Sequence, residues 1–388
     1  MLKTKPKITY NKPRNRYIVS YFLENNETKE KVRVRKSFIT EDKAKEFAEE
    51  LEYKSNSNIF LDNNSIPLNK LMRFIVERKK KMGSISDQQY GKTLKLIEKI
   101  ERTSVGNMDI SEITSEDLQN YFDTLTNYRN SYIQKHLIQF TQAFTYAQNK
   151  GYIKINPMSD TYKPKSTKPT RVIRAMELEE QEKLTNYLKS KTAQEEPYKN
   201  AFLIQLYAGL RIGEVMALQI NDIDLENNLI KVNKTLTRNA EEKIIMGNGT
   251  KTFAGTREIP IPDIIKNELK EQIEISKTNF NGQLFVSKTG KYADPRNANA
   301  ILKRILINEF SINDISTHSL RHTFGTRCIE SGMAPVVVQR LMGHKDISIT
   351  LNTYTSILNK FKEDELQKLK DYYNNNINLN LSDKEREI

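Results

Sequence analysis

The chain has 388 residues, enough for two or three domains, and 37% of them are hydrophobic, which is sufficient for packed cores. Lys and Arg total 62 against 49 Asp and Glu, and the net charge of +13 favours a polyanionic partner. No apolar run is long enough for a signal peptide or a membrane span, so no membrane association is expected. The single Cys328 cannot form an internal disulfide, which indicates a cytoplasmic protein.

The N-terminal segment is strongly basic and contains two alternating stretches, residues 16–22 and 31–38, that predict β-strands. A helix is expected from about residue 41 to 53, with Thr40 as its N-cap. Residues 1–60 are therefore expected to form a small sheet with a helix. Such a sheet can enter the major groove of DNA, although a solvated basic hairpin is the alternative. The candidate DNA contacts are Arg14, Arg16, Arg33 and Arg35.

Apolar residues recur at helical spacing through residues 66–158, which predicts a four-helix bundle. Two of the predicted apolar faces consist of Tyr90, Leu94 and Ile97, and of Ile133, Leu137, Phe140 and Phe144. Basic side chains on these helices either touch a DNA backbone or are only solvated. They are Lys92, Lys95, Arg129 and Lys135. Residues 159–174 contain Pro164 and Pro169 among polar positions and indicate an exposed linker.

Residues 175–371 are predicted to be mostly helical, with strands near 229–232 and 257–261, and residues 372–388 form a polar tail. The predicted fold is thus multidomain and mainly α: a small N-terminal β-sheet plus helix, a helical bundle, and a mixed α/β domain that is mostly helical.

Three short blocks in the C-terminal half carry the candidate chemistry. The first, residues 208–215 (AGLRIGEV), follows an apolar run of helical period. A glycine after such a run is a helix stop, so Gly209 predicts that Arg211 emerges in a turn between two helices. Glu214 is expected to hold the Arg211 guanidinium by charge-assisted hydrogen bonds.

The second block, residues 317–324 (THSLRHTF), places His318 and Arg321 on one face of a helix, because they are three residues apart. Leu320 and Phe324 are expected to anchor another face in the core.

The third block begins with the sequence LMGH and ends at Tyr354. Gly343 is expected to interrupt one helix, and His344 and Tyr354 to flank a short new one.

Together with Lys251, which lies between the first two, these blocks supply the groups needed to break a DNA strand by tyrosine attack without a metal or a cofactor. Two guanidiniums can bind a phosphodiester, a lysine can protonate a leaving oxygen, two imidazoles can share protons and a phenol can be the nucleophile. The candidate catalytic residues are Arg211, Lys251, His318, Arg321, His344 and Tyr354, with Glu214 in support.

The blocks AGLRIGE, HxLRHTF and LMGH, followed by Thr353 and Tyr354, resemble the tyrosine recombinase (phage integrase) family over about residues 175–360. The resemblance implies that the six candidate residues form the active site. It also implies an arm-type DNA-binding domain in residues 1–60, a core-binding domain in 66–158 and a catalytic domain in 175–371. The spacing from His344 to Tyr354 is one residue longer than in Xer-type members and favours integrases of phages and conjugative transposons.

The resemblance further implies strand cleavage through a 3′-phosphotyrosyl intermediate, with no metal, cofactor or ATP, to integrate and excise a mobile element. The expected partners are double-stranded DNA attachment sites of core and arm type, three further copies of the chain in a homotetramer, an excisionase and a host DNA-bending protein.

Several alternatives remain open from the sequence. His318 and His322 have the spacing of a metal pair, but no third ligand accompanies them, so His322 is interpreted as structural. The segment 247–252 faintly resembles a phosphate-binding loop and is interpreted as a hairpin turn. Tyr372 and Tyr373 are rival tyrosines without a matching context.

Three other functions compete with an integrase: a DNA-binding accessory protein that has lost catalysis, a Xer-type resolvase, and a type IB topoisomerase. The retention of all six site residues argues against the first. The basic N-terminal sheet argues against the other two.

Overall fold

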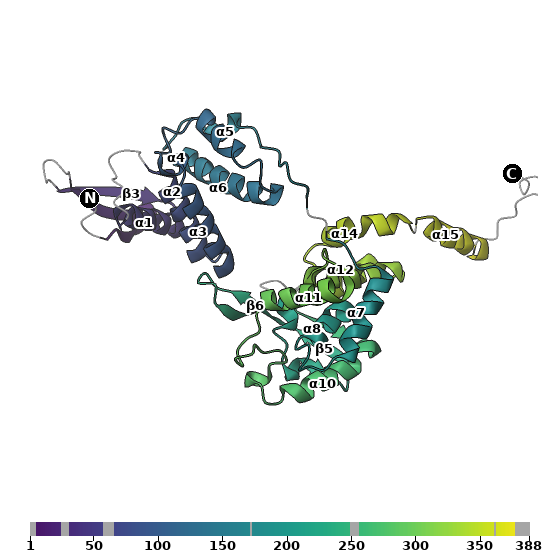
Figure 1. Ribbon diagram of the computed structural model, residues 1–388. Helices are drawn as coiled ribbons and strands as arrows, with labels where there is room; N and C mark the ends of the chain where they lie inside the picture. Colours follow the sequence, from purple (N-terminus) through teal and green to yellow (C-terminus); the bar gives the residue numbers. More distant parts are fainter. Residues whose placement is uncertain are drawn as a thin grey trace, which may run out of the picture. The chain divides into compact units, whose positions relative to one another are not determined.

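The computed structural model describes residues 5–24, 31–56, 66–170, 173–248, 256–360 and 362–376. The chain divides into two compact units, Met1–Arg171 and Val172–Ile388. The fold is mainly helical with a small N-terminal antiparallel sheet, which confirms the predicted class (Figure 1). None of the described helices is long and apolar enough to cross a membrane.

The N-terminal sheet has the order β1-β2-β3 and is antiparallel throughout. Its elements are β1 Lys7–Asn11, β2 Arg16–Glu24, β3 Lys31–Phe38 and the following helix α1 Glu41–Asn56. Val19 and Tyr21 pack with Ala44, Ala48 and Leu51 of α1 in a small core. The sequence predicted β2, β3 and α1 but missed β1, whose five residues are too few to show a clear alternation.

The register places the arginines of the sheet on the face away from α1. Phe22 pairs with Arg33 and Ser20 with Arg35, whereas the core residue Tyr21 pairs with Val34. Because neighbouring side chains on a strand point to opposite faces, Arg33 and Arg35 lie on the uncovered face. Arg16 shares this face, since it is five residues before Tyr21 on β2.

The rest of the first unit is a helical bundle. Its helices are α2 Leu68–Lys81, α3 Asp87–Glu101, the short α4 Ser104–Asn107, α5 Ser115–Asp123 and α6 Asn130–Asn149, followed by the 3-10 turn Pro157–Asp160. Four long helices are thus present, as the apolar spacing predicted. Ile97, Ile133, Phe140 and Phe144 are all buried in its core. In the predicted linker, the backbone N–H of Thr167 donates to the carbonyl of Thr126 over 2.9 Å.

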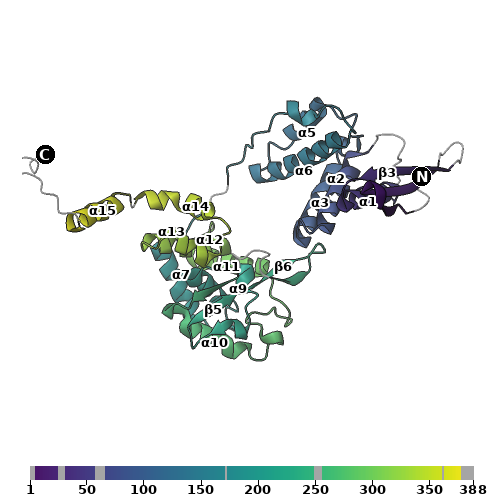
Figure 2. The ribbon, with the colours of Figure 1, turned by 180° about the vertical axis from the view of Figure 1, so that it is seen from behind.

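The second unit is built from helices and two small sheets, β4-β5-β8 and β6-β7. Its helices are α7 Leu178–Ser190, α8 Lys199–Ala208, α9 Ile212–Val215, α10 Lys266–Ser276, α11 Pro295–Phe310, α12 Thr317–Glu330, α13 Pro335–Met342, α14 Ile347–Lys360 and α15 Lys362–Asn376. Its strands are β4 Ile223–Asp224, β5 Leu229–Val232, β6 Lys234–Arg238, β7 Ile244–Asn248 and β8 Arg257–Pro260. Helix α12 packs against α8. It also packs against α13 and α14 (Figure 2).

Two sequence predictions about this unit are wrong in detail. Tyr354 lies in the middle of α14 and does not follow a short helix, because no glycine or proline interrupts the 14-residue segment. The predicted hairpin turn at 247–252 is also misplaced, since Gly247 lies within β7 and pairs with Thr235. The turn between β6 and β7 is formed by Asn239 to Glu242, where Glu242 adopts a positive φ of 63°. Residues 249–252 lie outside the described part of the chain.

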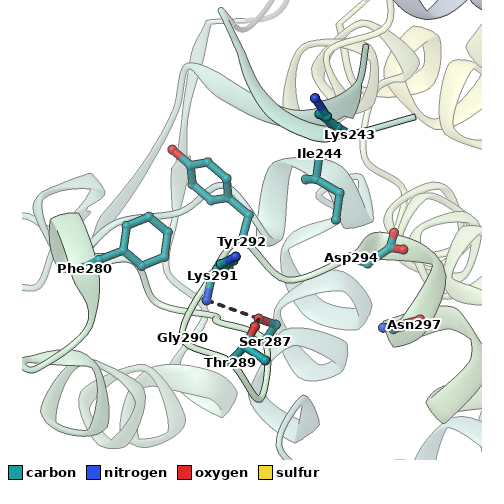
Figure 3. Close-up of a pocket in the computed structure, with 10 residues that line it drawn as sticks. All are labelled: Lys243, Ile244, Phe280, Ser287, Thr289, Gly290, Lys291, Tyr292, Asp294 and Asn297. Carbon is teal, nitrogen blue, oxygen red and sulfur yellow. Dashed lines mark hydrogen bonds between the residues drawn. The ribbon is translucent and has the colours of Figure 1, made fainter. Parts of the chain in front are cut away.

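A hollow of about 620 Å³ lies beside the start of β7 (Figure 3). Phe280 and Tyr292 line it with ring centroids 5.0 Å apart, and Lys243 and Lys291 also contribute to its wall. The backbone N–H of Lys291 donates to the Ser287 hydroxyl and closes the adjacent turn.

Candidate active site

Gly209 ends α8 and sets the position of Arg211. Its φ of +69° is the left-handed conformation of a helix C-cap, as the sequence predicted. A side chain at this position would collide with the ring of Phe324, so the site requires glycine for both backbone and space. Arg211 follows as the N-cap of α9, and its backbone N–H donates to Glu214 Oε2 over 2.9 Å.

Arg321 comes from α12 and is almost completely buried, with 2% of its side chain exposed. Its Nη1 donates to the carbonyl of Gly209 over 2.8 Å, and its Nη2 donates to the carbonyl of Met342. Burial and the neighbouring charge of Arg211 lower the pKa of Arg321 to about 9. Helix α12 therefore presents one guanidinium to the segment that holds Arg211.

Arg257 is a third arginine at this place, and sequence reasoning did not identify it as a site residue. It is the first residue of β8 and is 7% exposed. Its Nη2 donates to Glu214 Oε2 over 2.8 Å, and its Nε donates to the carbonyl of Leu341 over 2.7 Å. The sequence predicted a strand at 257–261, which contains Arg257. No local pattern indicated that the side chain contacts Leu341 on α13.

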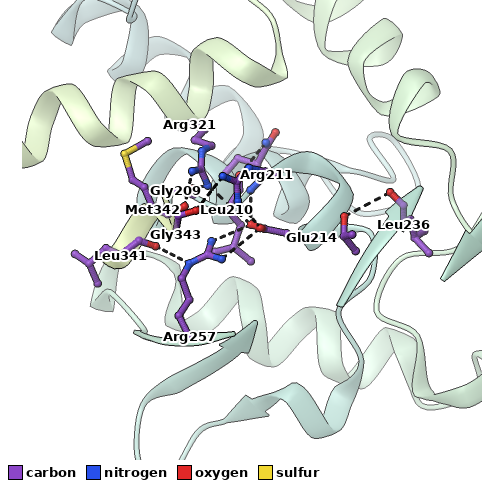
Figure 4. Close-up of polar contacts among 12 residues, drawn as sticks. Gly209, Leu210, Arg211, Glu214, Leu236, Arg257, Arg321, Leu341, Met342 and Gly343 are labelled. Carbon is purple, nitrogen blue, oxygen red and sulfur yellow. Dashed lines mark hydrogen bonds and ion pairs between the residues drawn. The ribbon is translucent and has the colours of Figure 1, made fainter. Parts of the chain in front are cut away.

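The three arginines bind three consecutive backbone carbonyls at the end of α13 (Figure 4). Arg257 donates to the carbonyl of Leu341 and Arg321 to that of Met342. Arg211 Nη2 donates to the carbonyl of Gly343 over 3.1 Å. The last carbonyls of a helix have no partner within the helix and carry the negative end of its dipole. The guanidiniums therefore satisfy these groups and fix the segment that leads into His344.

Glu214 is the anion at the centre of this cluster and is 5% exposed. Its carboxylate lies 2.8 Å from Arg211 Nη1, 2.8 Å from Arg257 Nη2 and 3.9 Å from Arg321 Nη1. Burial alone would raise the pKa of Glu214, but the hydrogen bond and charge of Arg257 and the charge of Arg211 outweigh it and lower the pKa to about 2. The sequence predicted the contact with Arg211, and the structure adds two more arginines to it.

His318 and His344 both lie in the field of these arginines. Burial is the main cause that lowers the pKa of each imidazole, and the charges of Arg321 and Arg211 lower it further. The pKa of His344 falls to about 4, and its Nδ1 is 2.8 Å from the hydroxyl of Thr350. At neutral pH both rings are therefore neutral. Among the described residues, no three His, Cys, Asp or Glu side chains are grouped in a way that could hold a metal ion.

Tyr354 is fully buried in a socket, where it packs from α14 against residues of α12 and α13. Its hydroxyl is 3.5 Å from the sulfur of Met342, and its ring stacks on that of His322. A side chain on Gly325 would collide with the hydroxyl, so this glycine makes the space for it. Burial raises the pKa of Tyr354, and Arg321 acts in the opposite direction. The charge of Arg321 thus acts on the phenol, although the phenolic oxygen faces an apolar socket.

The remaining predicted residues are placed as follows. Lys251 lies outside the described residues. All eight candidate DNA-contact side chains are exposed, namely Arg14, Arg16, Arg33, Arg35, Lys92, Lys95, Arg129 and Lys135. The rival Tyr372 and Tyr373 lie exposed near the end of α15.

Comparison with known proteins assigns a large part of the second unit to a protein family. Residues 174–360 match the model of the family described as "Phage integrase family". Residues 174–360 are thus a tyrosine recombinase domain, the kind of domain that cleaves and rejoins DNA by site-specific recombination.

Individual relatives agree with this assignment. A "Tyrosine recombinase XerC-like" protein of Caldanaerobacter subterraneus subsp. tengcongensis is 29% identical over 301 residues, which cover 71% of this chain and 75% of the relative. The "Integrase" of Staphylococcus phage L54a is 27% identical over 303 residues, which cover 70% and 84%. The fold is similar to that of the Tn1549 transposon integrase solved with transposon right end DNA, with a TM-score of 0.64, 22% identity, and coverage of 77% of this chain and 99% of that one.

Proposed function

We propose that this chain is the integrase of a phage or conjugative transposon, which cuts and rejoins double-stranded DNA at attachment sites to integrate and excise the element. The observation that carries the proposal is the convergence of Arg211, held by Glu214, and Arg321 from two separate segments onto the end of α13, beside His344. Two guanidiniums held in this way can bind the two non-bridging oxygens of a phosphodiester.

In the proposed reaction, Tyr354 attacks the scissile phosphorus. The bond from its oxygen to phosphorus forms as the bond from phosphorus to the 5′ oxygen breaks, which leaves a 3′-phosphotyrosyl link. His318 or His344, neutral at pH 7, accepts the phenolic proton, and Lys251 protonates the leaving 5′ oxygen. The phosphoester is retained, so a second DNA end can displace the tyrosine without ATP, metal or another cofactor.

The buried position of Tyr354 requires a movement before attack. The oxygen faces the side chain of Met342 and Gly325, whereas Arg321 binds the backbone carbonyl of Met342. We propose that DNA binding or assembly of the homotetramer releases α14 from this socket. Exposed Leu366 and Leu369 on α15 support docking of the C-terminal region, with the tail 372–388, on a neighbouring copy.

The N-terminal sheet is proposed to bind arm-type sites, with the bundle of residues 66–158 binding core sites. The uncovered face of the sheet carries Arg16, Arg33 and Arg35, and the covered face packs on α1. An exposed basic face suits a DNA groove. An excisionase and a host DNA-bending protein are the proposed accessory partners.

The test of the proposal is covalent capture on a nicked suicide substrate that carries the attachment site. The wild-type chain should form a protein-linked strand, and Tyr354→Phe should form none while it binds the duplex with an affinity within about threefold of wild type. Tyr372→Phe is the matched control and should form the adduct at the wild-type rate. An adduct with Tyr354→Phe would refute the nucleophile, and no adduct with wild type on any attachment site would favour a binding protein without catalysis.

A further inference from the structure

Arg257 occupies a place in the cluster that its sequence context does not explain. It binds both carboxylate oxygens of Glu214 and one carbonyl at the end of α13 at the same time. With 7% of its side chain exposed, it is more covered than Arg211, which is 42% exposed. The planar set of N–H donors on its guanidinium is used on Glu214 and Leu341, which are groups of the protein itself.

Arg257 connects two parts of the proposed phosphate site, in addition to the direct bond from Arg211 to the carbonyl of Gly343. Glu214 positions Arg211 through both the side chain and the backbone N–H. Leu341 precedes Gly343 and His344 on the segment that ends α13. A side chain that binds Glu214 and Leu341 together therefore fixes the distance between Arg211 and His344.

We propose that Arg257 is a positioning residue for strand cleavage, which sets Arg211 and His344 relative to each other around the scissile phosphate. This inference rests on the proposed function of the same site. Loss of this guanidinium would leave Glu214 free to turn and the end of α13 with an unsatisfied carbonyl. In metal sites, groups that orient the ligands typically change activity about 10- to 100-fold when removed, and we expect an effect of the same order for Arg257.

The test compares single-turnover adduct formation by wild type, Arg257→Gln and Arg257→Lys. We expect Arg257→Gln to react about 10- to 100-fold more slowly with unchanged DNA affinity. Arg257→Lys keeps the charge but lacks the planar guanidinium that binds two acceptors at once. Its rate of adduct formation should therefore lie between those of wild type and Arg257→Gln. Arg327→Gln is the matched control, because Arg327 also binds a carboxylate, that of Glu330, and a carbonyl, that of Met176. It should react at the wild-type rate.

A second substrate separates positioning from general loss of structure. In this substrate a methyl group replaces one non-bridging oxygen of the scissile phosphate, so that the group is neutral and depends less on correctly placed guanidiniums. The rate defect of Arg257→Gln should shrink to within about threefold on this substrate. An equal defect on both substrates, or no defect on the phosphate, would overturn the inference. Failure of the wild type itself to form an adduct would instead count against the proposed function.

Protein stability is measured in parallel. Rates are compared at a temperature well below the melting temperature of every variant. If Arg257→Gln does not fold, Arg257→Lys carries the test on both substrates, with the same two outcomes.

Discussion

The ring of His322 is stacked on the ring of Tyr354, with centroids 5.2 Å apart and 21° between the ring planes. His322 is one helical turn after His318 on α12, so the same helix serves the proposed phosphate site and covers the proposed nucleophile. Burial lowers the pKa of His322, and the ring is therefore neutral at pH 7 and packs as an aromatic group. This agrees with its interpretation as a structural residue.

Gly325→Ala should force Tyr354 out of its socket. The added methyl group occupies the position of the phenolic oxygen, and such overpacking costs about 1–3 kcal/mol. The measurement is nitration of Tyr354 by tetranitromethane, followed by peptide mass spectrometry. We expect faster nitration of Tyr354 in the variant, with nitration of the half-exposed Tyr10 unchanged as the internal control. Equal rates at Tyr354 in both proteins would contradict a closed socket.

Glu214→Gln should lower the free energy of unfolding by about 3–5 kcal/mol, since it leaves the buried charges of Arg257 and Arg321 without their anion. Chemical denaturation measures this change. Glu179→Gln is the control, because Glu179 is exposed and its ion pair is with the exposed Lys183, and it should cause no measurable change. A loss below about 1 kcal/mol for Glu214→Gln would mean that the arginines find other partners.

The stability of the helical bundle should fall in mild acid because of His136. This ring is 2% exposed, its Nδ1 is 2.6 Å from the hydroxyl of Tyr121, and burial with the charge of Lys99 lowers its pKa to about 4. Because the folded pKa is below the unfolded value of about 6.5, the unfolded chain binds more protons between these values. The stabilisation is complete above pH 6.5 and is lost as the pH falls towards 4.

Denaturant unfolding between pH 7 and 4 measures this effect. We expect His136 to account for a loss on the order of 2–3 kcal/mol across that range. His136→Gln should show a correspondingly shallower pH dependence, although it is less stable at pH 7. Identical slopes for the two proteins would show that the pKa of His136 is the same in the folded and unfolded states.

Arg33→Gln combined with Arg35→Gln should weaken binding to an arm-site duplex and reduce the slope of log affinity against log salt by about 2. Both side chains lie on the uncovered face of the sheet. Lys36→Gln is the control on the same strand, because Lys36 lies on the opposite face over the ring of Phe47. Fluorescence anisotropy at several salt concentrations gives the slopes. An equal reduction of the salt slope by Lys36→Gln would mean that the DNA does not bind specifically on the uncovered face of the sheet.

The sequence predicted the parts of the site that depend on local chain chemistry. Gly209 stops a helix whatever surrounds it, and the spacing of His318 and Arg321 puts both on one helix face. Arg257 was missed because its role depends on Leu341, 84 residues away, and no periodicity reports such a contact. The position of Tyr354 inside α14 was missed for a different reason, since the sequence suggested a shorter helix than the one that forms.

Met342 takes part in both halves of the site: its carbonyl accepts from Arg321, and its sulfur touches the hydroxyl of Tyr354. A shift of Met342 would therefore change the surroundings of Arg321 and of Tyr354 together. Release of the proposed nucleophile from its socket and the geometry of the proposed phosphate-binding arginines are thus connected through a single methionine.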